Sequence, residues 1–205
     1  VAEWQALSHL GDKAKNRNDF DEAERLLKES LTIVRKIGDK EGEASTLFVL
    51  GVNARKRNNF TDAENWYKES LTIKREIGDR HGEAQVMNNL ASSANYRGEV
   101  AEAERLYKES LTIKREIGDK EGEARTLNNL AINLSGRGEF ADSDQMFKES
   151  LTIAREVGDK EHEANVLRSL ALNARHQGNL SDSDRMFKES LTIARENGDR
   201  HGEAS

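Results

Sequence analysis

The stretch KESLTI at Lys28–Ile33 decides the fold, because the same six letters return at Lys68, Lys108, Lys148 and Lys188. The interval is 40 residues at every return. A fixed period of this length is typical of stacked repeat arrays, in which each repeat contacts only its neighbours. The sequence therefore predicts a repeat protein, not a single globule.

Each repeat contains two amphipathic helical segments. In the second copy, Ala44, Leu47 and Leu50 share one face of a first helix, and Tyr67 and Leu71 share one face of a second. Neither helix buries its apolar face alone, whereas stacking successive helix pairs buries both. We therefore expect an all-α solenoid of five helix-turn-helix repeats, forming one array over residues 1–205 (repeats 1–40, 41–80, 81–120, 121–160 and 161–200, with 201–205 starting a sixth).

The helix ends also repeat. Gly38-Asp39 recurs in register up to Gly198-Asp199, and we expect each Gly to close one helix and each Asp to cap the next. Thr61 and Glu64 have the spacing of a capping box for the second helix of the second copy. The KESLTI Ser and Leu should face neighbouring helices, and its Lys and Glu should face water.

The pattern resembles the tetratricopeptide repeat family. The third copy carries that family's order of large apolar, small and aromatic residues at Met87, Leu90, Ala91, Gly98, Ala103, Tyr107 and Ser110. The period is longer than the usual one of about 34 residues, and the chain has no Pro to end the second helix. In these respects it is similar to kinesin light chains, Pins-type polarity adaptors and the sensor arrays of prokaryotic regulatory ATPases. The resemblance implies a right-handed superhelix whose first helices line a concave surface.

That surface is where we expect a partner. The first-helix positions that point away from the core hold six Lys or Arg and one acid, although the whole chain has a net charge of −6. Asn amides can hold a peptide backbone, and Arg can bind carboxylates in a bidentate manner. The predicted partner is an extended or helical, acidic peptide, and its expected contacts are Asn88, Asn89, Asn128, Asn129, Arg125, Arg168, Arg175, Arg55, Phe48 and Tyr96.

Other classes of function are disfavoured. The chain has no Cys, which excludes disulfides and thiolate zinc sites, and His81 and His201 are too far apart in an array to share a metal. The KESLTI serines have no His in fixed register, so we expect no enzyme, cofactor or metal. The acidic balance argues against nucleic acid, and no apolar run approaches a membrane span. We expect a cytoplasmic location.

A second hypothesis concerns the two ends of the array. Val1 in place of Met and the partial sixth copy at 201–205 predict a piece of a longer array. Apolar residues near the ends belong to copies of internal interfaces and are therefore complementary. The alternative function is head-to-tail self-assembly, a contact that does not close on itself, through Trp4, Leu7, Met186 and Phe187.

Overall fold

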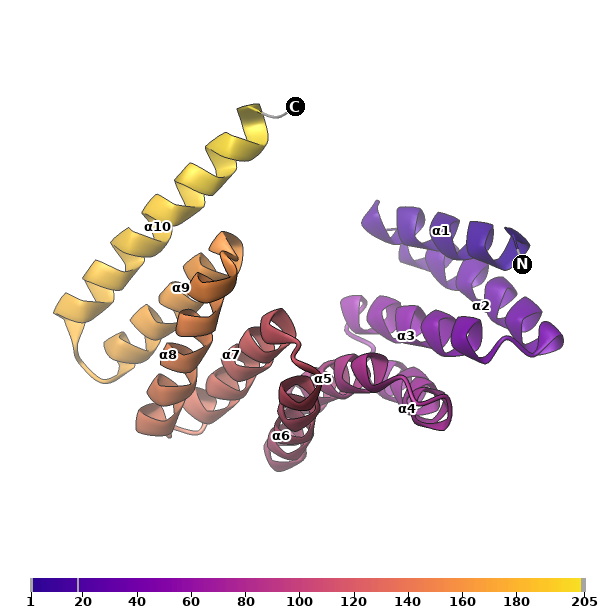
Figure 1. The fold of residues 1–205 in the computed structure, drawn as a ribbon, viewed down its shortest axis with the longest axis horizontal. Helices are drawn as coiled ribbons and strands as arrows, with labels where there is room; N and C mark the ends of the chain where they lie inside the picture. The colour runs from indigo at the N-terminus through magenta and orange to yellow at the C-terminus, as the bar shows by residue number, and fades with distance from the viewer. Residues whose placement is uncertain (1, 18, 204–205) are drawn as a thin grey trace. The chain divides into compact units, whose positions relative to one another are not determined.

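The computed structural model describes the backbone of residues 2–17 and 19–203 and, within them, the side chains of 4–11, 13–15, 17 and 19–198 (Figure 1). The described residues form ten α-helices and no strand. The chain divides into two compact units, residues 1–113 and 114–205. No helix among the described residues is both long and apolar enough to cross a bilayer.

The helices alternate between the two members of each predicted repeat. The first helices are α1 (Ala2–Asn16), α3 (Lys40–Lys56), α5 (Arg80–Tyr96), α7 (Lys120–Gly136) and α9 (Lys160–His176). The second helices are α2 (Phe20–Ile37), α4 (Phe60–Glu76), α6 (Val100–Ile117), α8 (Phe140–Val157) and α10 (Leu180–Glu203). The predicted all-α architecture of helix-turn-helix repeats is confirmed.

Stacking of successive hairpins builds the core of each unit. In the first unit, α1 packs on α2, α2 on α3 and α3 on α4, and first helices also contact one another, as α1 does α3. Leu27, Leu31, Leu47 and Leu50 form one buried cluster there. In the second unit, α7 to α10 pack in the same order, and Phe147, Leu151 and Leu167 belong to their buried cluster. Burial of each apolar face therefore depends on the neighbouring repeat.

The predicted Gly-Asp punctuation is confirmed at the first repeat boundary. Gly38 has a φ of 73°, a left-handed conformation that favours Gly. Asp39 then accepts a hydrogen bond from the Gly42 N–H at 2.8 Å and caps α3. Asn58 replaces Gly after α3 and adopts a φ of 59°, which Asn tolerates better than most residues.

Two predictions about helix ends are wrong. The cap of α4 is Asn59, whose Oδ1 accepts from the Asp62 N–H at 3.2 Å, so α4 begins before the proposed capping box at Thr61. The predicted stop at Gly198 is absent, because α10 continues to Glu203. No later helix among the described residues packs against α10 to favour a turn, and a Gly inside a helix costs only about 1 kcal/mol relative to Ala.

KESLTI has the same structural role in every repeat. The Ser70 hydroxyl is buried and donates to the Ala44 carbonyl at 2.8 Å, which joins the two helices of its repeat. The equivalent bond recurs for the other copies, with donors and acceptors Ser30 to Trp4, Ser110 to Ala84, Ser150 to Ala124 and Ser190 to Ala164. The recurrence of the motif is explained by this shared bond and by packing of the neighbouring Leu.

The Glu of KESLTI is exposed in the first two copies and half-buried in the other three, and it also joins neighbouring repeats. Arg115 donates through Nε to Glu123 at 2.7 Å and through Nη2 to Glu149. The same two ion pairs form in the other unit, where Arg35 binds Glu43 and Glu69. Arg therefore binds both helices of the next repeat, and Arg155 repeats the pattern with Glu163 and Glu189.

Candidate functional site

A hollow of about 420 Å³ lies along the first helices of the second unit. The two helices α7 and α9 contact each other, and the hollow follows their outward-pointing residues. Phe147 of α8 and Phe187 of α10 complete it from the second helices. We call this hollow the α7–α9 groove, and its lining is Ile132, Ser135, Phe147, Arg168, Ser169, Leu172, His176 and Phe187.

The groove is largely apolar. Phe147 is fully buried and forms part of the core, whereas Ile132 and Leu172 are exposed large apolar side chains. His176 stacks on Phe140 with ring centroids 6.0 Å apart and planes 8° apart. A surface of this kind offers shallow apolar contacts with a few polar groups, which suits a side chain of a partner protein.

Arg168 is the charged group of the groove. It is exposed and forms no ion pair or hydrogen bond with the described residues. It also lines a second hollow of about 420 Å³ beside the groove, with Asn165, Phe187 and Leu191. Arg35, Arg115 and Arg155 are held in ion pairs, whereas Arg168 presents its guanidinium to solvent.

The other predicted arginines have different surroundings. Arg125 is exposed but already reaches Asp159 at 3.3 Å and Glu121 at 3.4 Å. Arg175 is exposed and does not line the groove. Arg55, in the first unit, is half-buried beside Tyr67. Burial raises the pKa of Tyr67 to about 12, and the positive charge of Arg55 opposes that shift.

The predicted aromatic contacts lie in the first unit. Phe48 is half-buried and tilted against Tyr67, with centroids 5.8 Å apart and planes at 44°. Tyr96 is exposed and stacks on Phe60 at 5.0 Å, with planes 7° apart. Both aromatic rings therefore keep an exposed or half-exposed face on the first helices, and both already contact another ring.

The predicted asparagines are all half-buried on α5 and α7. Asn89 donates through Nδ2 to the Gln85 carbonyl of its own helix at 3.0 Å, so this donor is occupied. The Oδ1 of Asn128 is buried and accepts no hydrogen bond among the described residues. Asn88 and Asn129 lie beside them on the same two helices. The Asn128 oxygen is buried and is therefore not accessible to a partner in this conformation.

Two asparagines that the sequence interpretation missed do hold a backbone. Asn53 and Asn173 are buried, and they donate through Nδ2 to the carbonyls of Phe20 at 3.0 Å and Phe140 at 3.1 Å. Each bond joins a first helix to the start of the preceding second helix. Their spacing of three residues after the buried Leu50 and Leu170 was the available signal, because it places them on the packed side of the helix.

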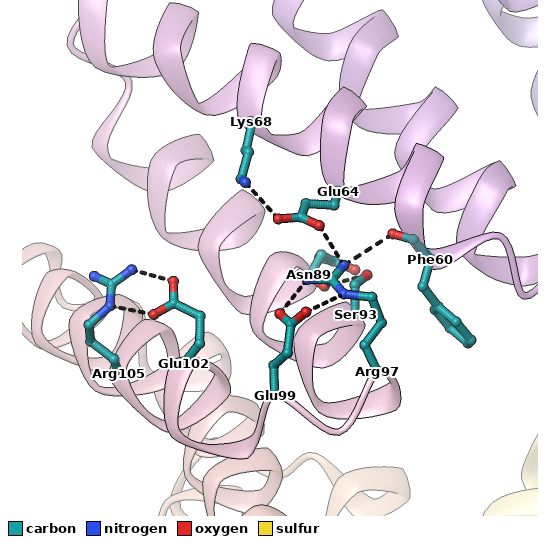
Figure 2. A network of polar contacts seen from close by, with 9 residues as sticks. All are labelled: Phe60, Glu64, Lys68, Asn89, Ser93, Arg97, Glu99, Glu102 and Arg105. Atoms are coloured by element: carbon teal, nitrogen blue, oxygen red, sulfur yellow. Dashed lines mark hydrogen bonds and ion pairs between the residues drawn. The ribbon is translucent and has the colours of Figure 1, made fainter.

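A polar network joins α4 to the turn between α5 and α6 (Figure 2). Arg97, with a side chain only 17% exposed, binds Glu64 at 2.8 Å and Glu99 at 2.6 Å and donates to the Phe60 carbonyl at 3.3 Å. Lys68, the KESLTI Lys of this repeat, binds Glu64 at 2.6 Å. Since Arg97 is held by two carboxylates and a carbonyl, the network stabilises the repeat and is not a site for a ligand.

One KESLTI serine has a His neighbour, although no His recurs in register with the five serines. Ser150 Oγ lies 3.0 Å from Nε2 of His162 and donates to the Ala124 carbonyl at 2.7 Å. Both side chains are buried, so a substrate has no access to the hydroxyl. Burial also lowers the pKa of His162. The pair is a packing contact between repeats. Among the described residues, no three His, Asp or Glu side chains gather as a metal ion would require.

The fold is that of a repeat scaffold for protein interactions, a class of solenoids that bind partners along their concave surfaces. The sequence profile of the tetratricopeptide repeat family matches residues 5–76, 82–156 and 136–196, and the chain belongs to this family. The family predicted from the sequence is thus confirmed. No curated protein sequence matches the chain.

Solved structures share the fold at low sequence identity. The crystal structure of BtubC (BKLC) from P. vanneervenii is similar with a TM-score of 0.84 and 20% identity, covering 95% of this chain and 81% of that one. A Podosopora anserina putative kinesin light chain with nearly identical TPR-like repeats gives 0.75 and 14%, covering 94% and 95%. A Rap protein complexed with competence and sporulation factor gives 0.84 and 15%, covering 96% of this chain and 55% of that one.

Proposed function

We propose that the α7–α9 groove binds an acidic segment of a partner protein, either extended or helical. The observation that carries the proposal is Arg168, an exposed guanidinium without an ion-pair partner among the described residues, beside an apolar hollow. A partner carboxylate can pair with Arg168 while an adjacent apolar side chain contacts Ile132 and Leu172.

The charge distribution supports the same partner. The chain carries a net charge of −6, yet the first-helix face contains mostly Lys and Arg among its charged residues. Local charge of this sign attracts acidic segments and raises the rate of encounter, and salt screens the effect.

The test is a binding titration with fluorescently labelled peptides of about 12 residues, a length on the scale of one helix. One peptide carries Glu and Asp around a central Leu, and its matched partner carries Lys and Arg instead. We expect the acidic peptide alone to bind, with an affinity that falls as salt rises. Arg168→Glu should lower that affinity by at least tenfold, and Leu172→Asp should also weaken binding.

The matched control is Arg185→Glu. Arg185 lies on α10, is exposed and pairs with Asp182, so its reversal changes the net charge equally without touching the groove. Equal losses for Arg168→Glu and Arg185→Glu would refute the site. Equal binding of the acidic and basic peptides would refute the proposed chemistry.

A further inference from the structure

Three side chains of α9 line the α7–α9 groove at regular intervals. Arg168, Leu172 and His176 stand four residues apart, so successive members are about 6 Å apart along the helix. All three side chains are exposed. We call this set the α9 row. It presents a guanidinium, an apolar side chain and an imidazole in that order along the groove.

The imidazole is the group of the α9 row that the proposed function leaves unused. His176 stacks on Phe140, which restricts its ring to one end of the groove. Its two nitrogens form no hydrogen bond or ion pair with the described residues. An imidazole ordinarily takes up a proton between pH 5 and 8 and is then a cation with two N–H donors. Protonated His176 is therefore a second group for a partner carboxylate, about two helical turns from Arg168.

The α9 row differs from the other first helices in its charge. The same register holds one basic residue on α3, Lys56, and none on α1, α5 or α7. The exposure of the row does not arise from its place near the end of the array, because Ile132 in the Leu172 register one repeat earlier is 45% exposed and Leu172 is 46% exposed. Of the residues predicted for end-to-end contact, Phe187 lines the groove, whereas Trp4, Leu7 and Met186 are half-buried elsewhere.

The charge of protonated His176 is not neutralised within the described part of the chain. The charged groups on the elements packed beside it are Arg175 on α9, Arg137 and Glu139 in the turn before α8, Asp144 on α8, and Asp182, Asp184 and Arg185 on α10. Arg137 pairs with Glu139 at 2.6 Å, and Arg185 pairs with Asp182 at 2.8 Å. No described carboxylate pairs with His176, so its positive charge is available to a partner.

The spacing of the α9 row matches an extended chain. In an extended segment every second side chain points to the same face, with a repeat of about 6.6 Å. That repeat is close to the step of about 6 Å between members of the row. A helical segment fits less well, because two helices that pack through rows of i, i+4 and i+8 cross at about 50° and separate beyond the central contact.

We propose that the α7–α9 groove recognises an extended segment of the form acid-x-apolar-x-acid. One carboxylate pairs with Arg168, the apolar side chain contacts Leu172 and Ile132, and the second carboxylate pairs with protonated His176. This motif rests on the proposed function above and adds a register and a pH dependence to it. Binding should strengthen as pH falls from 8 to 6, because the imidazole gains its charge while carboxylates of ordinary pKa, about 4, remain ionised.

Fluorescence anisotropy with three labelled peptides of identical composition tests the register. The first peptide carries Glu-x-Leu-x-Glu in an Ala background. The second places its two Glu side by side after the Leu, and the third places Glu, Leu and Glu four residues apart. At pH 6 and low salt, the first should bind at least about threefold more tightly than either of the others, the effect expected of one additional exposed ion pair.

Replacement of His176 separates its charge from its packing. His176→Gln should remove both the preference for the first peptide and the change of affinity between pH 6 and 8. His176→Arg should keep the preference and lose the pH dependence, because its charge is permanent. His81→Gln is the matched change of an exposed histidine in the first unit and should behave like the parent chain.

Three results would overturn the motif. They are equal binding of the three peptides, tighter binding of the peptide with four-residue spacing, and an unchanged pH profile in His176→Gln. The proposed function survives each of them if acidic peptides still bind and Arg168→Glu still weakens that binding. If no acidic peptide binds at either pH, the motif and the proposed function both fail. Should circular dichroism show His176→Gln to be unfolded, the pH profile of His176→Arg decides.

Discussion

Two contacts within the second unit occupy the same register, one made by a buried amine and the other by a buried imidazole. Each contact joins a second helix to the first helix that follows it. In the first, Lys114 is buried and donates to the Gly122 carbonyl at 3.1 Å and to the Thr126 hydroxyl at 2.8 Å. In the second, Ala154 occupies the Lys114 register and His162 the Gly122 register.

The difference shows that near-identical repeats need not form interchangeable interfaces. A large residue on the second helix accompanies Gly on the next first helix, and a small one accompanies His. At the step between Lys74 and Gly82, a Cβ on Gly82 would lie 2.4 Å from Asp79 Oδ2 and 2.8 Å from Lys74 Cδ, so both side chains fill the space beside this Gly. The chemistry of the buried group therefore changes from step to step while the surroundings stay closely packed.

The largest effect should come from removing the amine. Burial lowers the pKa of Lys114 from 10.5 to about 8, so keeping it charged at neutral pH costs on the order of 3 kcal/mol. Lys114→Met removes this cost but also loses the two hydrogen bonds of the amine. The free energy of unfolding should therefore rise by about 2 kcal/mol, less than the full cost of the buried charge. Denaturant unfolding at pH 7 measures it, with exposed Lys148→Met as the control.

The same variant tests the sign of the pH dependence. The folded pKa of Lys114 is below its unfolded value, so the folded state binds fewer protons between pH 8 and 10.5. The parent chain should become more stable as pH rises through that window, and Lys114→Met should lose this gain. A less stable Lys114→Met at neutral pH would mean that the two hydrogen bonds outweigh the burial cost.

The imidazole should give a smaller effect at acid pH. Burial lowers the pKa of His162 below 6.5, and the positive charge of Arg125 lowers it further. The negative charges of Asp159 and Glu161 raise it, but they do not cancel the effect of burial. The contribution of neutral His162 to the free energy of unfolding is fully present above pH 6.5. It is lost as the pH falls from 6.5 towards the pKa of His162 in the folded state, by at most about 1.4 kcal/mol per pH unit. Unfolding free energies at pH 5 and 7.5 should show this loss.

A double exchange sharpens the comparison. Ala154→Lys with His162→Gly gives this step the side chains of Lys74 and Gly82, where Lys74 binds Asp79 at 2.6 Å. The acid-dependent loss should shrink in the double variant, because the buried imidazole is gone and the introduced amine would meet Asp159 in the Asp79 register. His176→Ala on the groove is the matched histidine control. Parallel pH profiles for the parent and the double variant would contradict the assignment to His162.

The smallest effect should come from the ion pairs that both steps share. Arg115→Ala and Arg155→Ala each remove contacts to two carboxylates, but both Arg side chains are 47% exposed. Each change should cost about 0.5–1 kcal/mol, less in high salt, and nearly the same at the two steps. Unequal costs would show that these exposed Arg–Glu ion pairs depend on the buried group of the same step.

The sequence predicted those features whose causes are local or periodic. Gly38 and Asp39 mark a helix boundary by their own conformational preferences, and the buried faces follow from apolar spacing. It could not predict that Asn53 would bind the Phe20 carbonyl or that Arg35 would reach Glu69, because these contacts depend on the offset between stacked hairpins. It also ended α10 at Gly198, whereas the helix continues to Glu203.

For the candidate site, helical periodicity indicated the helix face and the residue types. It did not indicate which of these side chains are already held in ion pairs. Arg125 and Arg168 share that face, and both are exposed. Only the structure shows that Arg125 already reaches Asp159, whereas Arg168 has no such partner among the described residues. Helical phase cannot distinguish them, since an ion pair requires a carboxylate from the next repeat at the correct distance.

The bond from the KESLTI Ser has a consequence for how the chain folds. It joins residues 26 apart in every copy, so each hairpin closes a loop of the same modest length however many copies the chain contains. Loop-closure entropy per hairpin therefore stays constant as copies are added. The rate-limiting nucleus should need only neighbouring hairpins and can arise anywhere along the chain, so duplication lengthens the protein without slowing its acquisition of structure.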